Sequence, residues 1–222
     1  MTIDGPSGSG KGTVSRAAAK ALGWTLLDSG ALYRLVALAG RRAGVRLDDG
    51  PALARLARDF AIRFGSSDSG AEIVWLNAEE VTSAIRTEAA GNDASKVAAL
   101  PEVRAALLER QHRFAIPPGL VADGRDMGTV VFPHAKVKIF LTASAMERAA
   151  RRHKQLKEKG VAATLAGLSL EIAERDRRDV NRAIAPLVPS ADAILLDTTG
   201  MPVDTVVERV LSIARERLSR GA

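Results

Sequence analysis

The chain has 222 residues and a formal net charge of +6, and 46% of its residues are hydrophobic while 26% are charged. This length suits one large α/β domain or a core domain with a small insert, and the composition is ordinary for a globular protein. Cysteine is absent, which excludes disulfides, thiolate nucleophiles and thiolate metal sites. Because no apolar run could span a bilayer and the first residues lack the features of a secretion signal, we expect a cytoplasmic protein with no membrane partner.

Arginine supplies most of the positive charge of the chain. Its planar guanidinium donates two parallel hydrogen bonds to a phosphate and does not lose its charge. The excess of arginine therefore fits either nucleic acid or phosphorylated small molecules as partners. More than half of these arginines, among them Arg41, Arg42 and Arg215, are explained as solvated positions on helix faces.

The first fifty residues alternate between strands and helices. In chain order the pattern predicts a short strand, a helix, a buried strand and a second helix, over residues 2–4, 13–22, 24–27 and 31–43. A strand, glycine-rich loop, helix and strand in this order predict a parallel sheet with right-handed crossovers. The first strand begins almost at Met1 and is unusually short, which fits a chain that lacks a few upstream residues.

The pattern changes between about Pro51 and Arg113. We expect a helix, then two short strands around a turn-rich segment at 65–70, then further helices, over residues 51–61, 62–64, 72–76 and 97–115. The two strands and their turn predict a β-hairpin. Because this stretch interrupts the α/β alternation, we interpret it as an insert or subdomain.

The alternation then resumes. The expected strands and helices cover residues 120–122, 137–141, 145–159, 168–183 and 193–196. The first two are continuous apolar runs typical of buried parallel strands. The last helix places six apolar residues on one face at helical spacing, so this face is predicted to be core: Val206, Val207, Val210, Leu211, Ala214 and Leu218.

A glycine-rich segment connects the first strand to the first helix. It has the G-x-x-x-x-G-K spacing of a P-loop and consists of Gly5, Pro6, Ser7, Gly8, Ser9, Gly10, Lys11, Gly12 and Thr13. Its backbone N–H groups can wrap around a triphosphate, the following helix adds its positive N-terminal end, and Lys11 can reach the β- and γ-phosphates. The hydroxyl that usually follows the lysine is replaced by Gly12. Asp123 is a candidate for a water-mediated magnesium contact and equally a candidate for a helix or turn cap.

Several short sequence segments besides the P-loop, called boxes below, match those of one protein family. The Gly-Lys-Gly-Thr form of the P-loop is found in nucleoside monophosphate kinases, and other matching stretches lie at residues 27–34, 85–87, 123–133, 174–182 and 185–187. With these boxes the chain resembles the bacterial cytidylate kinase family over essentially its whole length. The resemblance implies an α/β fold: a P-loop parallel sheet flanked by helices, with an inserted monophosphate-binding subdomain and a short helical lid.

The resemblance also implies how the chain is divided and what it does. The chain would be one domain over residues 1–222 with three parts. The core would comprise residues of about 1–50, 114–147 and 184–222. The monophosphate-binding part with its insert would cover about 51–113, and the lid about 148–165. The implied reaction transfers the γ-phosphate of ATP, with Mg²⁺, to CMP or dCMP. The family expectation is a monomer.

Residues of the matching boxes are implied to bind the acceptor nucleotide. Cytosine presents an amino donor at position 4 and acceptors at N3 and O2, which suits a carboxylate or hydroxyl on one side and a cation on the other. By resemblance, Asp126 and Ser29 lie on the amino side, while Arg104 and Ser95 contact the rest of the base. The wrong base would leave buried polar groups unpaired, so such a site discriminates strongly.

The same resemblance assigns the phosphate and the sugar of the acceptor. Arg34 and Arg125 are implied to grip the phosphate, and Arg175 and Asp179 to bind the sugar hydroxyls, with Arg182 nearby. The last three lie at positions i, i+4 and i+7 and share one helix face. The alternative interpretation of this spacing is an exposed ion pair within the helix.

Residues 147–154 are dense in positive charge. By resemblance, arginines of this segment close over ATP and stabilise charge on the transferred phosphoryl group. Arg148 and Arg152 are the candidates that join Lys11 and Arg125 as catalytic groups, with Arg151 less favoured and a solvated helix face as the alternative. No general base is needed, because the second pKa of the acceptor phosphate is ~6. No protein metal ligand is assigned.

Three other functions are weighed against a cytidylate kinase. A kinase for UMP or AMP is the nearest, and the boxes at 28–34 and 124–129 argue against it. A regulatory GTPase is disfavoured because the chain contains no Asn-Lys-x-Asp motif for guanine. Nucleic acid is not expected as a partner, because basic residues fall within the phosphate boxes and aromatic residues make up only 4% of the chain.

Overall fold

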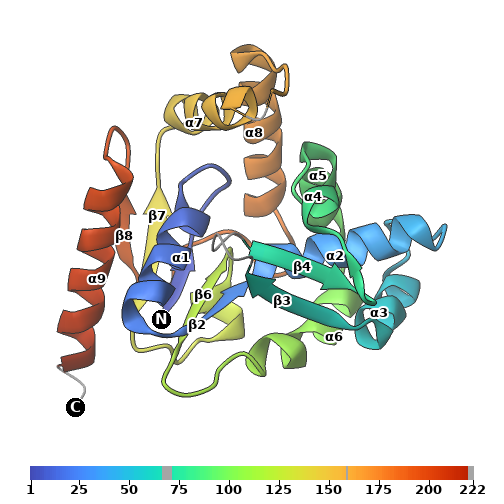
Figure 1. The fold of residues 1–222 in the computed structure, drawn as a ribbon, viewed down its shortest axis with the longest axis horizontal. Helices are drawn as coiled ribbons and strands as arrows, with labels where there is room; N and C mark the ends of the chain where they lie inside the picture. The colour runs from blue at the N-terminus through green and yellow to red at the C-terminus, as the bar shows by residue number, and fades with distance from the viewer. Residues whose placement is uncertain (67–71, 159, 220–222) are drawn as a thin grey trace. The chain divides into compact units, whose positions relative to one another are not determined.

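The computed structural model describes residues 1–66, 72–158 and 160–219 (Figure 1). The chain forms two compact units, one made of residues 1–28 and 112–222 and the other of residues 29–111. The second unit therefore begins earlier than the boundary expected at about residue 51. The reason is that helix α2 (Ser29–Arg42) packs on helices α3 (Gly50–Asp59) and α5 (Glu88–Val97) of the second unit.

A five-stranded parallel sheet forms the centre of the first unit. Its strand order is β2-β6-β1-β7-β8, and the strands are β1 (Thr2–Asp4), β2 (Thr25–Asp28), β6 (Leu120–Gly124), β7 (Lys138–Thr142) and β8 (Ile194–Asp197). The register places Asp4 beside Gly124 and Phe140, so the carboxyl ends of the strands meet at one edge of the sheet. The predicted P-loop fold, a parallel sheet flanked by helices, is confirmed.

Within the described residues of the first unit, four α-helices and one short π-helix flank this sheet. They are α1 (Lys11–Leu22), η1 (Met127–Val131), α7 (Ala145–Glu158), α8 (Leu165–Val180) and α9 (Val203–Ser219). Helix α1 begins after Gly10 and ends at Gly23, both of which have positive φ angles that glycine adopts without strain. Helix α8 begins earlier than expected because the Thr164 hydroxyl accepts the N–H of Gly167 at 3.2 Å and caps the helix.

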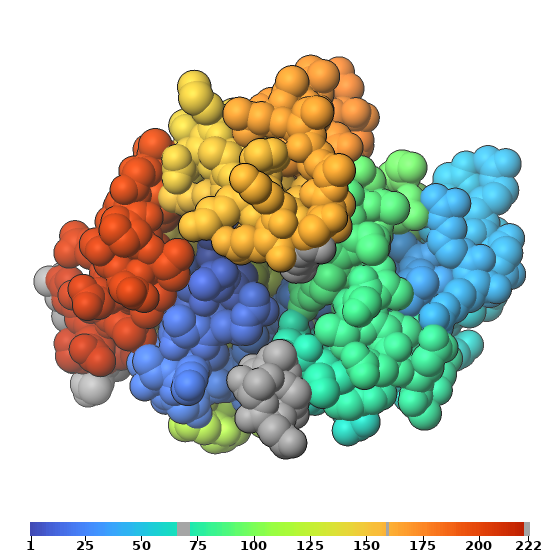
Figure 2. Space-filling model, turned by 45° about the horizontal axis from the view of Figure 1, so that its top comes forward, coloured from blue at the N-terminus to red at the C-terminus, as the bar shows by residue number. Residues whose placement is uncertain are grey.

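The core of the first unit lies where α1 and α9 pack on the sheet. Val14 of α1 and Val210 of α9 pack in one cluster with the fully buried Ile3 of β1 and Leu141 of β7. Figure 2 shows α9 in red along the side of the blue N-terminal segment, with the gold and orange helices α7 and α8 above it. The prediction that one face of the last helix is core is confirmed. Val206, Val210 and Ala214 are buried. Val207, Leu211 and Leu218 are partly buried against the same cluster.

The second unit contains an antiparallel sheet of strands β3 (Ile62–Ser66), β4 (Glu72–Leu76) and β5 (Glu79–Glu80). Ile62 pairs with Leu76, which confirms the predicted hairpin, although residues 67–71 of its turn lie outside the described residues. Strand β5 was not predicted. It follows a two-residue turn in which Asn77 and Ala78 both have positive φ, the conformation that a tight hairpin turn of this length requires.

Helices α4 (Thr82–Ile85), α5 and α6 (Pro101–His112) follow this sheet. The helices predicted over residues 97–115 match α6 but miss α5. Helix α5 begins where the Thr87 hydroxyl accepts the N–H of Ala90 at 3.1 Å, and α6 begins at Pro101. No helix in the described part of the chain combines the length and apolar character needed to cross a bilayer.

Candidate nucleotide-binding site

The predicted P-loop joins β1 to α1, in the strand–loop–helix context that a phosphate site requires. A Cβ atom at Gly5 would lie 2.0 Å from the Leu141 carbonyl oxygen, so only glycine lets the loop leave the sheet here. Within the described residues, the N–H groups of residues 7–10 have no hydrogen-bond acceptor. Consecutive unpaired N–H groups at a helix N-terminus form a site for an anion.

The carbonyl oxygens of Pro6, Ser7 and Ser9 in the loop, in contrast, are held by side-chain donors. Lys11 Nζ donates to the Pro6 carbonyl at 3.0 Å, and Arg148 Nη1 donates to the Ser7 carbonyl at 3.0 Å. The Ser9 carbonyl accepts from Arg151 Nη1. Since the C=O and N–H groups of a trans peptide point in opposite directions, tying the carbonyls to the surrounding protein directs the N–H groups the other way.

Lys11 and Asp123 are both buried beside the loop and interact electrostatically. Burial, and secondarily the Arg125 guanidinium, lowers the pKa of Lys11 to about 7. Burial raises the pKa of Asp123 to about 6, although Lys11 opposes this shift. A Cβ at Gly12 would lie 3.3 Å from Asp123 Oδ2, so the glycine in place of the usual hydroxyl leaves room for this carboxylate against the first turn of α1.

A pocket of about 320 Å³ lies beside the P-loop in the first unit. It is lined by residues 8–10 of the loop, by Arg151, Arg152 and Gln155 of α7, and by Thr198, Met201 and Val206 at the carboxyl end of β8 and in α9. Its size and its mixture of apolar side chains with a few polar groups are typical of a site for a small organic ligand.

The four cations proposed for catalysis lie in different surroundings. Arg148 is 6% exposed and donates to the Ala143 carbonyl at 3.0 Å, to the Ser7 carbonyl and to Asp176 Oδ2 at 2.6 Å. Arg152 lies in the same helix, lines the pocket and donates to Gln155 Oε1 at 3.2 Å. Arg148 is therefore fixed by protein acceptors at the start of α7, whereas Arg152 lines the pocket.

Arg125 belongs to a cluster with the residues proposed for the sugar. Its Nε donates to Asp179 Oδ2 at 3.0 Å, and Arg182 Nη2 donates to Asp179 Oδ1. Burial raises the pKa of Asp179, but the charges of Arg125, Arg182 and Arg175 outweigh it, so the pKa lies at about 2. The structure thus brings Arg125, Arg175, Asp179 and Arg182 together. The alternative interpretation, an exposed ion pair within the helix, is wrong because Asp179 is only 1% exposed.

Asp126 is buried at the start of the π-helix η1, and a second carboxylate holds this segment. Asp4 Oδ1 and Oδ2 accept the N–H groups of Met127 and Gly128 at 2.9 and 2.8 Å. Burial raises the pKa of Asp4 to about 7, against these two hydrogen bonds. The P-loop strand is thereby joined directly to the segment that carries Asp126. Short π-helices occur frequently at functional sites.

The remaining predicted residues lie in the second unit. Ser29 at the start of α2 donates to Gln111 Oε1 at 2.8 Å, and Arg104 of α6 donates to the Tyr33 hydroxyl at 3.3 Å. Arg34 Nη1 donates to the carbonyl oxygens of Ile85 and Thr87. Both residues belong to the segment 85–87, one of the stretches that match the family. Ser29, Ser95 and Arg104 are all buried. Burial of these polar side chains fits hydrogen bonding to the polar groups of a base better than a position on a solvated helix face.

The amino-acid sequence matches the model of one protein family, described as cytidylate kinase, over residues 1–216. The chain belongs to the cytidylate kinase family. It is 58% identical over 212 residues to the cytidylate kinase of Marinomonas sp. (strain MWYL1), covering 96% of this chain and 93% of that protein. The cytidylate kinase of Azotobacter vinelandii is 59% identical over 213 residues, with the same shares. That of Klebsiella pneumoniae is 56% identical over 219 residues, covering 99% of this chain and 96% of the relative.

The resemblance inferred from the sequence boxes is thereby confirmed. Among solved structures, a gluconokinase from Sinorhizobium meliloti 1021 aligns with 98% of this chain and 93% of its own, at 17% identity and a TM-score of 0.49. That similarity is too distant to bear on function. The assignment to the cytidylate kinase family rests on the sequence matches.

Sequence reasoning missed four residues that hold parts of the candidate site in place. They are Asp4, Gln111, Asp176 and Thr198. Three of them are buried polar residues, a class that sequence alone does not separate from exposed ones. The one available signal was at Asp4, a carboxylate that ends an apolar strand directly before the first glycine of the P-loop.

Proposed function

We propose that the chain transfers the γ-phosphate of ATP to CMP or dCMP, giving ADP and CDP or dCDP, and that it does so as a cytoplasmic monomer. The family match over residues 1–216 and relatives that are 54% to 59% identical support this activity. The observation in the structure that carries the proposal is the P-loop. Its carbonyls at Pro6, Ser7 and Ser9 accept side-chain hydrogen bonds, while the N–H groups of residues 7–10 have no acceptor within the described residues.

The donor nucleotide is proposed to bind in the first unit. The phosphates of ATP would accept the loop N–H groups at residues 7–10, and the adenosine part would occupy the pocket beside them. Lys11 would exchange its bond to the Pro6 carbonyl for the β- and γ-phosphates. The negative phosphates would raise the lowered pKa of this lysine and keep it charged.

The residues around the P-loop also fit a magnesium ion that arrives with ATP. Mg²⁺ keeps several waters and binds through substrate phosphates with one or two carboxylates. The buried Asp123 carboxylate next to Gly12 supplies one such group, and we propose that it acts through water. When bound, the ion would neutralise charge on the donor phosphates.

The acceptor nucleotide is proposed to bind through the residues that the family resemblance names. Asp126, Ser29, Ser95 and Arg104 would read cytosine, and Arg34 and Arg125 would bind its phosphate. Arg175, Asp179 and Arg182 would bind the sugar. The low pKa of Asp179, about 2, keeps it an acceptor for sugar hydroxyls at any physiological pH.

Catalysis in this proposal is positioning and charge neutralisation. The acceptor phosphate has a second pKa of ~6, so its attacking oxygen is already deprotonated near neutral pH and no general base is required. Lys11, Arg125, Arg148 and Arg152 would surround the transferred group with positive charge, which matches the charge spread over its oxygens. The oxygen of the acceptor phosphate forms the new bond to phosphorus as the bond to ADP breaks.

The experiment is a coupled assay of ADP release with ATP and magnesium, presenting CMP, dCMP, UMP, AMP and GMP in turn. We expect fast turnover with CMP and dCMP only. The Lys11→Ala variant should lose turnover by about a hundredfold or more, while Lys20→Ala, at the exposed end of the same helix, should not. A preference for another nucleotide would still support a kinase activity but would reject the assignment of the cytosine-binding residues. Absence of turnover with every nucleotide would reject the proposed function.

A further inference from the structure

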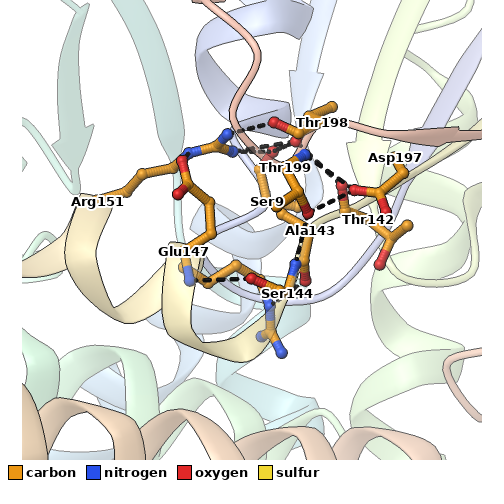
Figure 3. A network of polar contacts seen from close by, with 10 residues as sticks. Ser9, Thr142, Ala143, Ser144, Glu147, Arg151, Asp197, Thr198 and Thr199 are labelled. Carbon is orange, nitrogen blue, oxygen red and sulfur yellow. Dashed lines mark hydrogen bonds and ion pairs between the residues drawn. The ribbon is translucent and has the colours of Figure 1, made fainter.

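Thr198 follows strand β8 directly and contacts the phosphate-binding loop (Figure 3). The residue is 1% exposed. Its hydroxyl oxygen lies 3.0 Å from the Thr142 carbonyl and 3.3 Å from the Ser9 carbonyl, so its single proton lies between two acceptors. The same oxygen accepts a hydrogen bond of 3.0 Å from Arg151 Nη1. Thr198 therefore joins the ends of β7 and β8 to the P-loop.

Arg151 reinforces this contact from helix α7. Its Nη1 also donates to the Ser9 carbonyl at 3.3 Å, and its Nη2 donates to the Thr198 carbonyl at 2.5 Å. An ion pair with Glu147 at 2.9 Å, one helical turn earlier, fixes the orientation of the guanidinium. Figure 3 shows the guanidinium turned toward Thr198. Two side chains from distant segments thus meet at one carbonyl oxygen of the loop.

The Ser9 carbonyl shares its peptide unit with the N–H of Gly10. This peptide is trans, so its C=O and N–H groups point in opposite directions. Holding the carbonyl toward Thr198 and Arg151 turns the N–H away from them, and within the described residues that N–H has no acceptor. Gly10 has a φ of 91°, and a glycine at this position offers little resistance to rotation of the peptide before it.

We propose that Thr198 is a positioning residue for the phosphate donor. Its hydroxyl, with Arg151, holds the Ser9–Gly10 peptide in the orientation that presents the Gly10 N–H to a phosphate of ATP. Without this tie the peptide turns over part of the time, and a carbonyl oxygen then faces the phosphate and repels it. This inference rests on the proposed function, because it names how the same site binds its donor.

A neighbouring residue provides a matched control. The Thr199 hydroxyl donates to Asp197 Oδ1 at 2.6 Å and accepts the N–H of Ser144 at 2.9 Å (Figure 3). It belongs to the same network and the same turn, but it makes no hydrogen bond to the P-loop. Replacing either threonine by valine removes one hydroxyl and keeps the shape of the side chain.

The test compares Thr198→Val, Thr198→Ser and Thr199→Val with the unchanged protein. The steady-state KM for ATP and for CMP, kcat, and the Kd of ATP from calorimetry are measured for each. For Thr198→Val we expect KM and Kd for ATP to rise about tenfold, the loss expected for one hydrogen bond to a charged group. The KM for CMP should change by less than about twofold. Thr198→Ser should restore ATP binding, and Thr199→Val should leave it unchanged.

Each other outcome overturns the proposal. A Thr198→Val protein that folds and binds ATP within about twofold of the unchanged protein removes the positioning role. An equal rise in the KM of both substrates, or an equal effect of Thr199→Val, assigns the network to general structure. If Thr198→Val does not fold, Thr198→Ala takes its place, and failure of both to fold assigns the hydroxyl to the fold alone. Absence of turnover by the unchanged protein, in contrast, is a failure of the proposed function.

Discussion

The guanidinium of Arg148 donates a hydrogen bond of 3.0 Å to the carbonyl oxygen of Ser7, which joins helix α7 to the phosphate-binding loop. The same guanidinium donates to Asp176 of α8 at 2.6 Å. One cation therefore connects α7 and α8 to the loop that is proposed to hold ATP. An arginine in this place contributes to the fold as well as to the charge around the transferred phosphate.

Arg148 and Arg152 should respond differently to truncation, although they lie one turn apart in α7. Arg148→Ala leaves the Ser7 carbonyl and the Asp176 carboxylate without their donor, so we expect it to lower the free energy of unfolding by about 2–3 kcal/mol as well as activity. Arg152→Ala should lower kcat by about a hundredfold with less than about 0.5 kcal/mol lost, because this side chain is partly exposed and lines the pocket. Urea denaturation and steady-state kinetics of both variants check this, and equal stability of the two would contradict it.

Binding of ATP with magnesium should take up a proton at pH 8. The pKa of Lys11 is lowered from 10.5 to about 7 by burial and by Arg125, so most of the unliganded protein has a neutral lysine at pH 8. Triphosphate next to the amine raises its pKa and charges it. Calorimetry in two buffers of different ionisation enthalpy should give an uptake approaching one proton at pH 8 and much less at pH 6, where Lys11 is already charged. Equal uptake at both values would show that Lys11 does not titrate on binding.

Asp4→Asn should destabilise the fold, and more at pH 5 than at pH 7. The Asn side chain has one oxygen, which can accept only one of the N–H groups of Met127 and Gly128. Its NH₂ group is a donor and would face the second N–H. The pKa of Asp4 is raised from 3.8 to about 7, so between these values the folded state holds a proton that the unfolded state has lost. The stability that the protonated Asp4 contributes is therefore lost as pH rises from 3.8 to about 7. Asn does not titrate, so the variant does not share this pH dependence.

The cost of Asp4→Asn should consequently fall by about 2 kcal/mol between pH 5 and pH 7. Denaturation of both proteins at the two pH values measures it, since contributions from other groups cancel in the difference. A cost that is constant, or that grows toward pH 7, would show that burial does not raise the pKa of Asp4.

Asp126→Ala should reduce the preference for CMP over UMP. A carboxylate accepts the amino group of cytosine, whereas uracil presents a carbonyl oxygen at the same position. We expect the ratio of kcat/KM values for CMP and UMP to fall by about a hundredfold, mostly through the rate with CMP. The KM for ATP serves as the control. An unchanged ratio would mean that another residue reads the base.

The sequence predicted elements whose signals are local. The P-loop spacing and the apolar runs at 120–122 and 137–141 identified the phosphate loop and the central strands. Helix α5 was missed because its start depends on a single capping hydroxyl, that of Thr87. Strand β5 was missed because two residues are too few for a pattern of alternation.

The contacts that position the candidate site depend on the tertiary fold and left no local signal. Thr198 meets Ser9 across 189 positions of sequence, and Asp4 meets Met127 across 123. Only the strand order and register bring these segments together. The resemblance to a family named candidate residues at 125, 179 and 182, but it did not reveal that Asp179 is almost fully buried between two arginines.

The most direct test of the central claim is to measure both products of one reaction. ATP, magnesium and an equal mixture of CMP and UMP are incubated with the protein, and the nucleotides are separated by ion-exchange chromatography. We predict that CDP and ADP appear in equal amounts while UMP remains unchanged in the early phase. Formation of UDP at a comparable rate, or of ADP without CDP, would contradict a kinase that transfers the phosphate of ATP to cytidine monophosphates.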